Sequence, residues 1–329
     1  MSATGSGPRT LLCLGDPNGI GPEIAVRAAL ALSPAPVLVG DRGVVEAAVR
    51  VTGSDAEVRE HRPGRAPEAG LLDLVDVPVL PAAAHRPGRV EPAAGAATLA
   101  YARTAIRAAA AGDHRAVVAA PHSETAVRAA GETFSGYPSL LAEMTGTPQD
   151  RVFLLLVGGG LRIVHATLHQ SLSGALAALD TDRVVAAGHA LRRALADLGV
   201  PGGRMAVFGI DPHAGEGGLF GDADQRITEP AVARLRADGV PVDGPTGADE
   251  LLAEPRHVGY VAAYHDQGHV PVKLLAGRTA VAMAVGTGVP FCSVGHGAAF
   301  DLAGTGRADP AALIRALRTV DPAAEVAAE

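Results

Sequence analysis

The sequence predicts an α/β protein of two domains, with a mostly parallel sheet and an antiparallel part in the second domain. Short apolar runs alternate with segments of helical length along most of the chain, which is typical of helix-covered parallel sheets. The 329 residues are enough for two domains. Two apolar runs in the middle of the chain flank Gly158-Gly159-Gly160, which indicates a hairpin. We expect one domain at residues 1–125 and 280–329 and the other at 126–279.

In the first domain, strands are expected at residues 10–14, 37–39 and 116–120. Pro22 and Glu23 favour a helix start, because proline needs no N–H partner there and a carboxylate complements the helix dipole. Further helices are expected from Asp41 to about Val51 and at 93–111. Residues 53–92 are rich in Pro, Gly and Arg and are interpreted as irregular surface with an edge strand near 71–79.

In the second domain, strands are expected where apolar runs end in polar residues, at 152–157, 161–166, 204–209 and 258–263. Helices are expected at 180–198 and 227–238. An apolar strand at 280–285, a glycine-rich loop at 295–310 and a helix at 311–318 complete the chain.

Composition excludes several classes of function. The net charge of −7 and the absence of tryptophan argue against nucleic-acid binding. No apolar run reaches the ~18 residues of a membrane span, and the N-terminus lacks a signal-peptide core. Cys13 and Cys292 both lie in apolar runs, which indicates reduced buried thiols and a cytoplasmic protein.

Three histidines come shortly after predicted strands: His169, His213 and His265. Three imidazoles with one open coordination position suit a Zn²⁺-type site, although imidazole also binds Fe and Co. His165 and His269 lie near these residues in the sequence and are alternative candidates for metal ligands. His165 could instead support a ligand without binding the metal. His265 lies in the stretch Tyr264–Lys273, which also contains Asp266, a lysine and two expected bends at glycine or proline.

Four runs resemble the 4-hydroxythreonine-4-phosphate dehydrogenase family, namely residues 15–24, 211–218, 264–273 and 295–310. The resemblance implies a two-domain fold like that of isocitrate and isopropylmalate dehydrogenases. It also implies NAD(P), a divalent metal (Zn or Fe) on His169, His213 and His265, and a homodimer with a shared active site. By the same resemblance Lys273 binds substrate and Asp249 is a pocket aspartate. The candidate cofactor-binding residues are Gly15, His296, Gly297, Asp301 and Gly304.

The sequence also departs from that family. Gly136-Tyr137-Pro138-Ser139 stands where the family has Gly-His-Thr-Glu, and Glu124 stands in place of a lysine. Ala284 and Ser293 replace a substrate-binding asparagine and arginine. Since such donors recognise phosphate and carboxylate groups, their loss beside retained metal and cofactor motifs implies a changed substrate.

The runs 121–126, 134–142 and 161–169 resemble the terephthalate dihydrodiol dehydrogenases. This resemblance implies NAD-linked oxidative decarboxylation of 1,2-dihydroxy-3,5-cyclohexadiene-1,4-dicarboxylate to protocatechuate and CO₂. Lys273 and Asp249 are then candidate catalytic residues, and Tyr137 and His122 candidate substrate contacts. The alternatives are a dehydrogenase of a phosphorylated hydroxy acid such as 4-phosphohydroxy-L-threonine, and an inactive NAD-binding protein.

Overall fold

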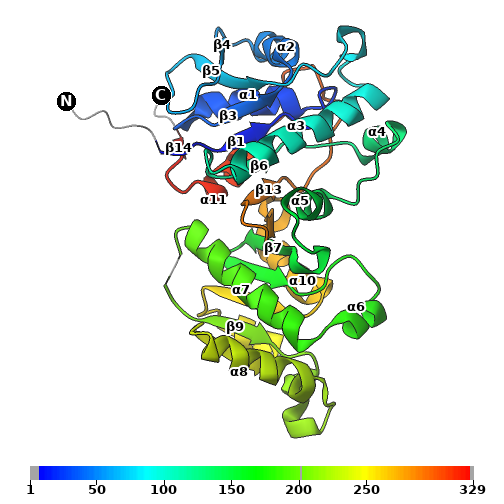
Figure 1. Ribbon diagram of the computed structural model, residues 1–329, viewed down its shortest axis with the longest axis vertical. Helices are drawn as coiled ribbons and strands as arrows, with labels where there is room; N and C mark the ends of the chain where they lie inside the picture. The colour runs from blue at the N-terminus through cyan, green and yellow to red at the C-terminus, as the bar shows by residue number, and fades with distance from the viewer. Residues whose placement is uncertain (1–6, 201, 327–329) are drawn as a thin grey trace, which may run out of the picture. The chain divides into compact units, whose positions relative to one another are not determined.

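The computed structural model describes residues 7–200 and 202–326 and contains two compact units (Figure 1). Unit 1 comprises residues 1–140 and 289–329, and unit 2 comprises residues 141–288. The sequence placed these boundaries at 125 and 280 instead. Helix α4 (Glu124–Ala129) belongs to unit 1 because it packs closely on α3 (Pro92–Ala110), where the Ala126 backbone lies beside Gly95.

Unit 1 contains a parallel sheet in the strand order β13-β6-β1-β3-β5-β4. The strands are β1 (Leu11–Cys13), β3 (Val37–Gly40), β4 (Glu57–Glu60), β5 (Leu71–Asp76), β6 (Val117–Ala119) and β13 (Phe291–Ser293). Every residue of β1, β3 and β6 is buried, as expected for strands covered by helices on both faces. The edge strand is β4, so the sequence-based assignment of the edge to residues 71–79 is wrong.

Helices pack around this sheet and include the expected ones. They are α1 (Gly21–Ala31), α2 (Arg42–Thr52), α3, α4 and α11 (Ala311–Val320). The chain passes from unit 1 to unit 2 within α5 (Tyr137–Thr145). Helix α3 contacts β1, β3 and β6, whereas α1 contacts β3, β5, α2 and α11. A small antiparallel sheet joins β2 (Leu32–Ser33) to β14 (Glu325–Val326). Short 3₁₀ turns lie at Ala82–Ala84 here and at Gln149–Arg151 and Gly277–Thr279 in unit 2.

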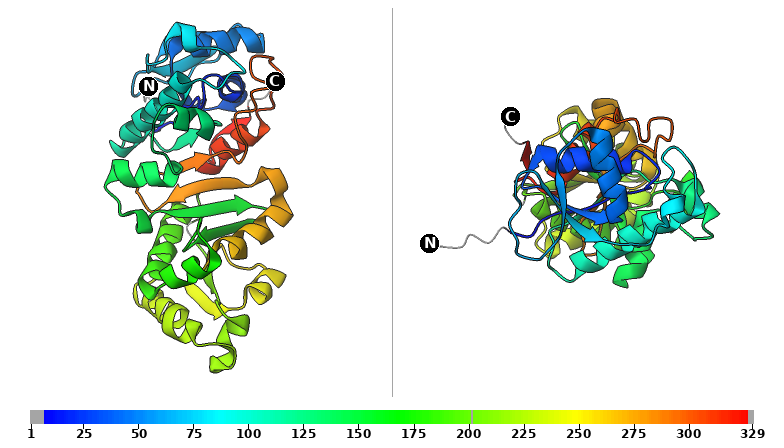
Figure 2. Two further views of the ribbon diagram at one scale, coloured as in Figure 1. Left: turned by 90° about the vertical axis from the view of Figure 1, so that its right-hand side faces the viewer. Right: turned by 90° about the horizontal axis from the view of Figure 1, so that it is seen from above.

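Unit 2 contains a mixed sheet in the order β10-β9-β11-β8-β7-β12. The strands are β7 (Phe153–Gly158), β8 (Leu161–His165), β9 (Met205–Phe208), β10 (Val242–Thr246), β11 (Gly259–Ala262) and β12 (Val281–Val285). Strands β10, β9, β11 and β8 are parallel to one another. Strand β7 is antiparallel to both β8 and β12 (Figure 2). The α/β class, the mostly parallel sheet and the hairpin predicted from the sequence are confirmed.

Two faces of the unit 2 sheet receive different helices. Helix α7 (Thr181–Asp197) places Leu191 against Gly259. Tyr260 and Ala262 of β11 point to the opposite face of the sheet from Gly259. They share a core with Val272 of α10 (His265–Ala276). The remaining helices are α6 (Leu172–Ala178), α8 (Glu229–Ala237), which follows a π-turn at Asp224–Thr228, and α9 (Ala248–Ala253). Helix α10 corrects the sequence-based expectation of two bends, because the helix continues through Gly268 and Pro271.

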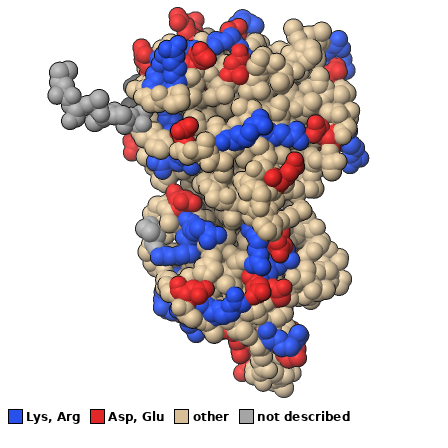
Figure 3. Space-filling view, in the orientation of Figure 1, with Lys and Arg blue, Asp and Glu red and all other residues tan. Residues whose placement is uncertain are grey.

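Charged side chains of both signs are interspersed over the face drawn in Figure 3. Across residues 7–200 and 202–326, no helix has the length together with the hydrophobicity that a membrane crossing demands.

Gly95 provides a test of packing within unit 1. A Cβ at Gly95 would lie 2.2 Å from the carbonyl oxygen of Ala126 and 2.5 Å from the amide nitrogen of Val127. Glycine-to-alanine in a helix normally stabilises by ~1 kcal/mol, but here α3 and α4 must separate. We expect Gly95→Ala to lower the free energy of unfolding by about 2–3 kcal/mol, measured by urea denaturation.

The matched control is Gly43→Ala in α2, where nothing lies within 4 Å of the added methyl group. This variant should be stabilised by roughly 0.5–1 kcal/mol. Similar stabilisation of both variants would show that the α3–α4 contact is not close.

Candidate active site

Four candidate residues follow the carboxyl ends of the four parallel strands in unit 2. His169 follows β8, His213 follows β9, Asp249 follows β10 and His265 follows β11. Because these strands run in the same direction, their carboxyl ends lie at one edge of the sheet, which is where α/β proteins bind ligands. Since β11 lies between β8 and β9, His265 follows the strand that neighbours both of those preceding His169 and His213.

The structure brings His169 and His265 together. Their ring centroids are 5.6 Å apart. Two imidazoles bound to one Zn²⁺ at ~2.1 Å would have ring centroids roughly 5–6 Å apart. Both residues line a cavity of about 220 Å³, together with Leu168, Gln170, Leu172, Ala175, Tyr264 and Asp266. The two rings are therefore spaced as a shared cation requires.

His265 hydrogen-bonds a neighbouring carboxylate. It is the first residue of α10, and its Nδ1 lies 2.6 Å from Oδ1 of Asp266. Because a carboxylate only accepts, Nδ1 carries the hydrogen, and in the neutral ring Nε2 has the free lone pair. Metal-binding histidines commonly donate their other N–H to such a partner. The donor chemistry of His265 therefore fits a divalent cation.

Two further histidines adjoin this pair. The His269 ring stacks on His265 with centroids 3.8 Å apart and planes at 11°. His269 Nδ1 lies 3.0 Å from Nε2 of His165, which is buried. Burial lowers the pKa of His165 to about 3 and, with His265 nearby, that of His269 to about 4. The sequence named both residues only as competitors, although the i, i+4 spacing of His265 and His269 was a usable signal.

His213 lies apart from this cluster in the single chain. It belongs to an exposed turn (Pro212–Gly218) in which residues 213–217 all have positive φ, and its ring centroid is 6.1 Å from that of Phe220. Within residues 7–200 and 202–326, no group of three or more His, Cys, Asp or Glu side chains is placed to hold a metal ion. One chain thus pairs two of the three predicted ligands.

The His213 loop is anchored by Asp224, which sequence reasoning missed. This carboxylate is fully buried and accepts hydrogen bonds from the amides of Ile210 and Asp211 and from the Thr228 hydroxyl. Asp224→Ala would leave these donors unpaired, so we expect a loss of about 2–3 kcal/mol and faster proteolysis of the loop.

The control for this variant is Asp222→Ala. Asp222 is exposed and pairs with Arg226. Exposed pairs of this kind contribute little, so unfolding should change by at most about 0.5 kcal/mol. Equal effects of the two substitutions would contradict the anchoring role of Asp224.

Lys273 and Asp249 occupy different elements of unit 2. Lys273 lies on α10, one turn beyond His269, and is exposed. Asp249 lies in the first turn of α9 and is also exposed. The strand β10 and the helix α9 were not expected from the sequence, which left Asp249 without an assigned element.

The candidate cofactor residues all lie in unit 1. They belong to the turn after β1 and to the glycine-rich loop at residues 295–310. Gly15 has φ +69°, and a Cβ there would lie 2.1 Å from the Pro121 carbonyl oxygen. The loop that contains His296, Gly297, Asp301 and Gly304 is tied to the start of α1. Its attachments are hydrogen bonds from the Ile20 amide to the Ala298 carbonyl and from the Gly306 amide to Glu23. The structure therefore brings the turn after β1 beside the glycine-rich loop at residues 295–310 that carries the other candidate cofactor residues.

Tyr137 and His122 pack together in an aromatic cluster of unit 1. Their ring centroids are 5.0 Å apart, and the Tyr137 ring also contacts Phe134 and Phe291 at 5.4 and 4.6 Å. Burial raises the pKa of Tyr137 and lowers that of His122. The sequence did not single out Phe134 and Phe291, because a lone aromatic residue gives no distinctive spacing.

Comparison with known proteins shows the family to which the chain belongs. Residues 33–320 match the family described as "Pyridoxal phosphate biosynthetic protein PdxA". The chain is 47% identical over 310 residues to a 1,2-dihydroxy-3,5-cyclohexadiene-1,4-dicarboxylate dehydrogenase of Comamonas sp, covering 94% of this chain and 96% of the relative. It is 39% identical over 318 residues to a 4-hydroxythreonine-4-phosphate dehydrogenase of Aromatoleum aromaticum, covering 94% of each.

A solved structure extends this similarity to the fold. The crystal structure of a terephthalate 1,2-cis-dihydrodiol dehydrogenase from Burkholderia xenovorans LB400 has 50% sequence identity and a TM-score of 0.81, covering 98% of this chain and 100% of that one. The fold and these matches define an enzyme of the dehydrogenase class, as the sequence predicted. The chain belongs to the PdxA family, so the resemblance stated from its sequence motifs is confirmed.

Proposed function

We propose that this enzyme oxidises 1,2-dihydroxy-3,5-cyclohexadiene-1,4-dicarboxylate with NAD and releases CO₂ to give protocatechuate. The observation that carries the proposal is the pairing of His169 and His265 in one cavity. It occurs in a chain 47% identical to the Comamonas dehydrogenase named for this substrate. The two-domain architecture of isocitrate and isopropylmalate dehydrogenases, and a cytoplasmic location in keeping with the free thiols Cys13 and Cys292, are parts of the same proposal.

The departures from the B6-pathway pattern favour this substrate. The family resemblance places Ala284 and Ser293 at positions of an asparagine and an arginine that bind substrate, and a dihydrodiol dicarboxylate has no phosphate to bind. The rings of Tyr137 and His122 meet edge to face at 70° and supply aromatic, largely apolar contacts for a six-membered ring. We propose these two residues as substrate contacts.

A divalent cation, Zn or Fe, would be held by His169, His213 and His265. When bound, the cation supplies Lewis-acid chemistry at the hydroxyl and its neighbouring carboxylate, and NAD accepts the hydride. Of this chain's own residues, Lys273 and Asp249 are the two candidates to take the hydroxyl proton. The Lys273 ammonium can alternatively bind a substrate carboxylate, and Asp249 can orient a histidine. Gly15, His296, Gly297, Asp301 and Gly304 are proposed to bind NAD.

We infer that His213 reaches the site from a second copy of the chain, in a homodimer. Two apolar groups support an interface on unit 2. Leu274 and Leu275 of α10 are 81% and 64% exposed, and Leu219 and Phe220 beside His213 are 71% and 51% exposed. Exposed apolar clusters of this kind commonly mark protein contacts. A dimer that buries both would complete the three-histidine set.

The direct test is NADH formation from the dihydrodiol by purified enzyme, followed at 340 nm with and without a chelator. We expect turnover together with protocatechuate release, a loss of at least about 100-fold on chelation, and recovery with Zn²⁺ or Fe²⁺. Preference for 4-phosphohydroxy-L-threonine would favour the phosphorylated hydroxy acid instead. NAD binding without metal or turnover would favour an inactive binding protein.

A further inference from the structure

His265 is backed by a second imidazole from its own helix. His269 lies four residues later on α10, so both rings lie on one face of the helix. Their centroids are 3.8 Å apart and their planes differ by 11°. A ring stacked this closely limits rotation of the His265 side chain and thereby fixes the direction of its Nε2 lone pair.

The His269 ring is held in turn by His165. His165 Nδ1 lies 3.0 Å from the carbonyl oxygen of Leu154, which only accepts, so Nδ1 carries the hydrogen. The Nε2 of a neutral His165 is then an acceptor, and it lies 3.0 Å from His269 Nδ1. His269 therefore donates through Nδ1, and both its tautomer and its ring orientation are set by a strand of the core.

His165 itself has little freedom. It is 1% exposed at the end of β8. A Cβ at Gly268 would lie 2.4 Å from His165 Nε2 and 2.8 Å from Ile163 Cγ2. The glycine thus leaves the space that the imidazole fills, and α10 and β8 together clamp the ring.

The stacked geometry argues against His269 as a direct ligand. An imidazole lone pair lies in the plane of its ring, and a bound cation lies near that plane at ~2.1 Å from the nitrogen. One ion cannot lie in the planes of two stacked, nearly parallel rings whose centroids are 3.8 Å apart. The described residues also contain no three-residue group placed to hold a metal.

We propose that His269 and His165 are positioning residues which hold the His265 imidazole in the orientation that binds the divalent cation. His269 acts by stacking, and His165 acts only through its hydrogen bond to His269. This inference rests on the proposed function, because it assumes that His265 is a metal ligand.

The test measures Zn²⁺ affinity of the metal-free full-length protein by competition with a chromophoric chelator. We expect His269→Ala to raise the dissociation constant about 10–100-fold, as loss of a residue that orients a ligand does. His269→Phe keeps a flat ring over His265 and should recover part of this loss. His189→Ala is the control, because His189 lies on α7 and pairs with Asp238. The Zn²⁺ affinity of this variant should equal that of the wild type.

A double-mutant cycle separates positioning through His269 from a general structural role. His165→Phe should weaken Zn²⁺ binding, and His165→Gln provides a second variant if the first does not fold. His165→Phe combined with His269→Ala should bind no more weakly than His269→Ala alone. Additive losses would contradict the inference. In addition, the visible spectrum of Co²⁺-loaded His269→Ala should keep the wild-type band shape. A spectrum changed as expected for the loss of one imidazole ligand would overturn the positioning role.

Failure of this inference is distinguishable from failure of the proposed function. Wild-type protein that binds neither Zn²⁺ nor Co²⁺ would overturn both. Wild-type protein that binds Zn²⁺ while His269→Ala binds it equally tightly would overturn the positioning roles alone.

Discussion

Replacing His213 by alanine is expected to lower kcat/KM for the dihydrodiol at least about 1000-fold, equivalent to roughly 4 kcal/mol of transition-state stabilisation. The reason is the loss of one of three proposed metal ligands. His213 lies on an exposed turn with few packing contacts, so the fold should persist. Metal content by atomic absorption and far-UV circular dichroism measure the two effects separately. Full metal occupancy in the inactive variant would rule out His213 as a ligand.

Mixing two inactive variants tests whether the site is shared between subunits. In a His213→Ala/His265→Ala heterodimer, one site would take intact His265 from one subunit and intact His213 from the other. The second site would lack both. Because a two-fold dimer has two equivalent sites, random exchange of subunits should restore roughly a quarter of wild-type activity.

The same mixture distinguishes the opposite arrangement. If all three histidines came from one chain, each subunit of the heterodimer would carry a defective site and no activity would return. A His213→Ala/His169→Ala mixture should behave like the first mixture, since His169 and His265 are paired within one chain.

Local patterns predicted much of this architecture. The glycine run at 158–160 indicated the β7–β8 hairpin, and apolar runs ending in polar residues marked β8, β9 and β11. Parallel strands place their carboxyl ends at one edge, so the position of His169 and His265 followed from the sequence. The pairing of their rings did not, because it depends on the order of β8 and β11 in the sheet.

Helix α10 and strand β4 could not be predicted from local sequence. Helix α10 contains residues that disfavour a helix, and β4 lacks the apolar run that marks a strand. Gly268 and Pro271 both disfavour a helix. Gly268 is nevertheless needed beside the ring of His165, which lies 103 positions earlier in the sequence. Strand β4 reads Glu-Val-Arg-Glu, which has no apolar run. Its Arg59 instead bonds the buried Asp73 of β5. In both elements a tertiary contact outweighs local propensity.

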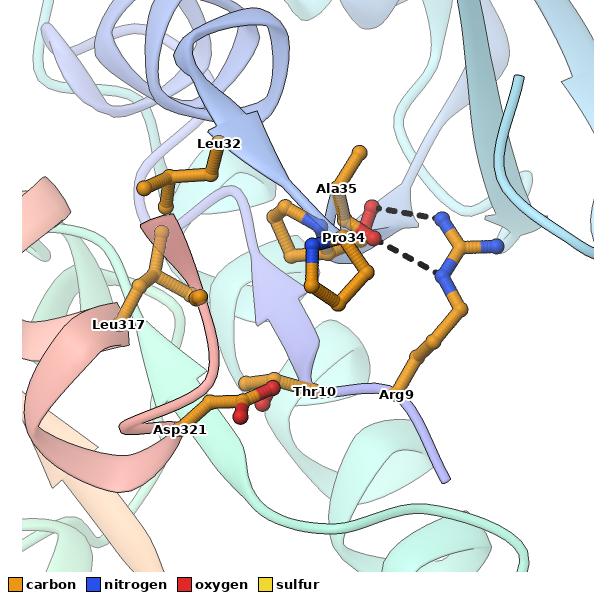
Figure 4. A pocket seen from close by; sticks show the side chains of 9 residues that line it. Arg9, Thr10, Leu32, Pro34, Ala35, Leu317 and Asp321 are labelled. Atoms are coloured by element: carbon orange, nitrogen blue, oxygen red, sulfur yellow. Dashed lines mark hydrogen bonds between the residues drawn. The ribbon is translucent and has the colours of Figure 1, made fainter. Parts of the chain in front are cut away.

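Asp73→Asn is expected to lower the free energy of unfolding by about 3 kcal/mol at pH 7, the lower end of the cost of breaking a buried ion pair. The Asp73 side chain is fully buried, with Oδ2 2.5 Å from Arg9 and Oδ1 2.6 Å from Arg59. The Arg9 guanidinium also bonds the carbonyl oxygens of Ala35 and Pro36 (Figure 4). Asparagine would leave the buried Arg9 guanidinium without its counter-charge, whereas Arg59 would keep only its exposed partner Glu68. Asp55→Asn, at an exposed position, is the control and should change stability by at most about 0.5 kcal/mol.

The effect of Asp73→Asn should depend on pH in one direction. Burial disfavours the Asp73 carboxylate, but hydrogen bonds from Arg59 and Arg9 outweigh it, and the pKa of Asp73 is lowered in the folded protein. A lowered folded pKa gives stability that is fully present above the unfolded value of about 3.9 and is lost as pH falls through the folded pKa. The stability difference between wild type and Asp73→Asn should therefore be constant from about pH 5 to 7 and shrink below about pH 4. A difference that stays constant in acid would mean that the carboxylate charge contributes nothing.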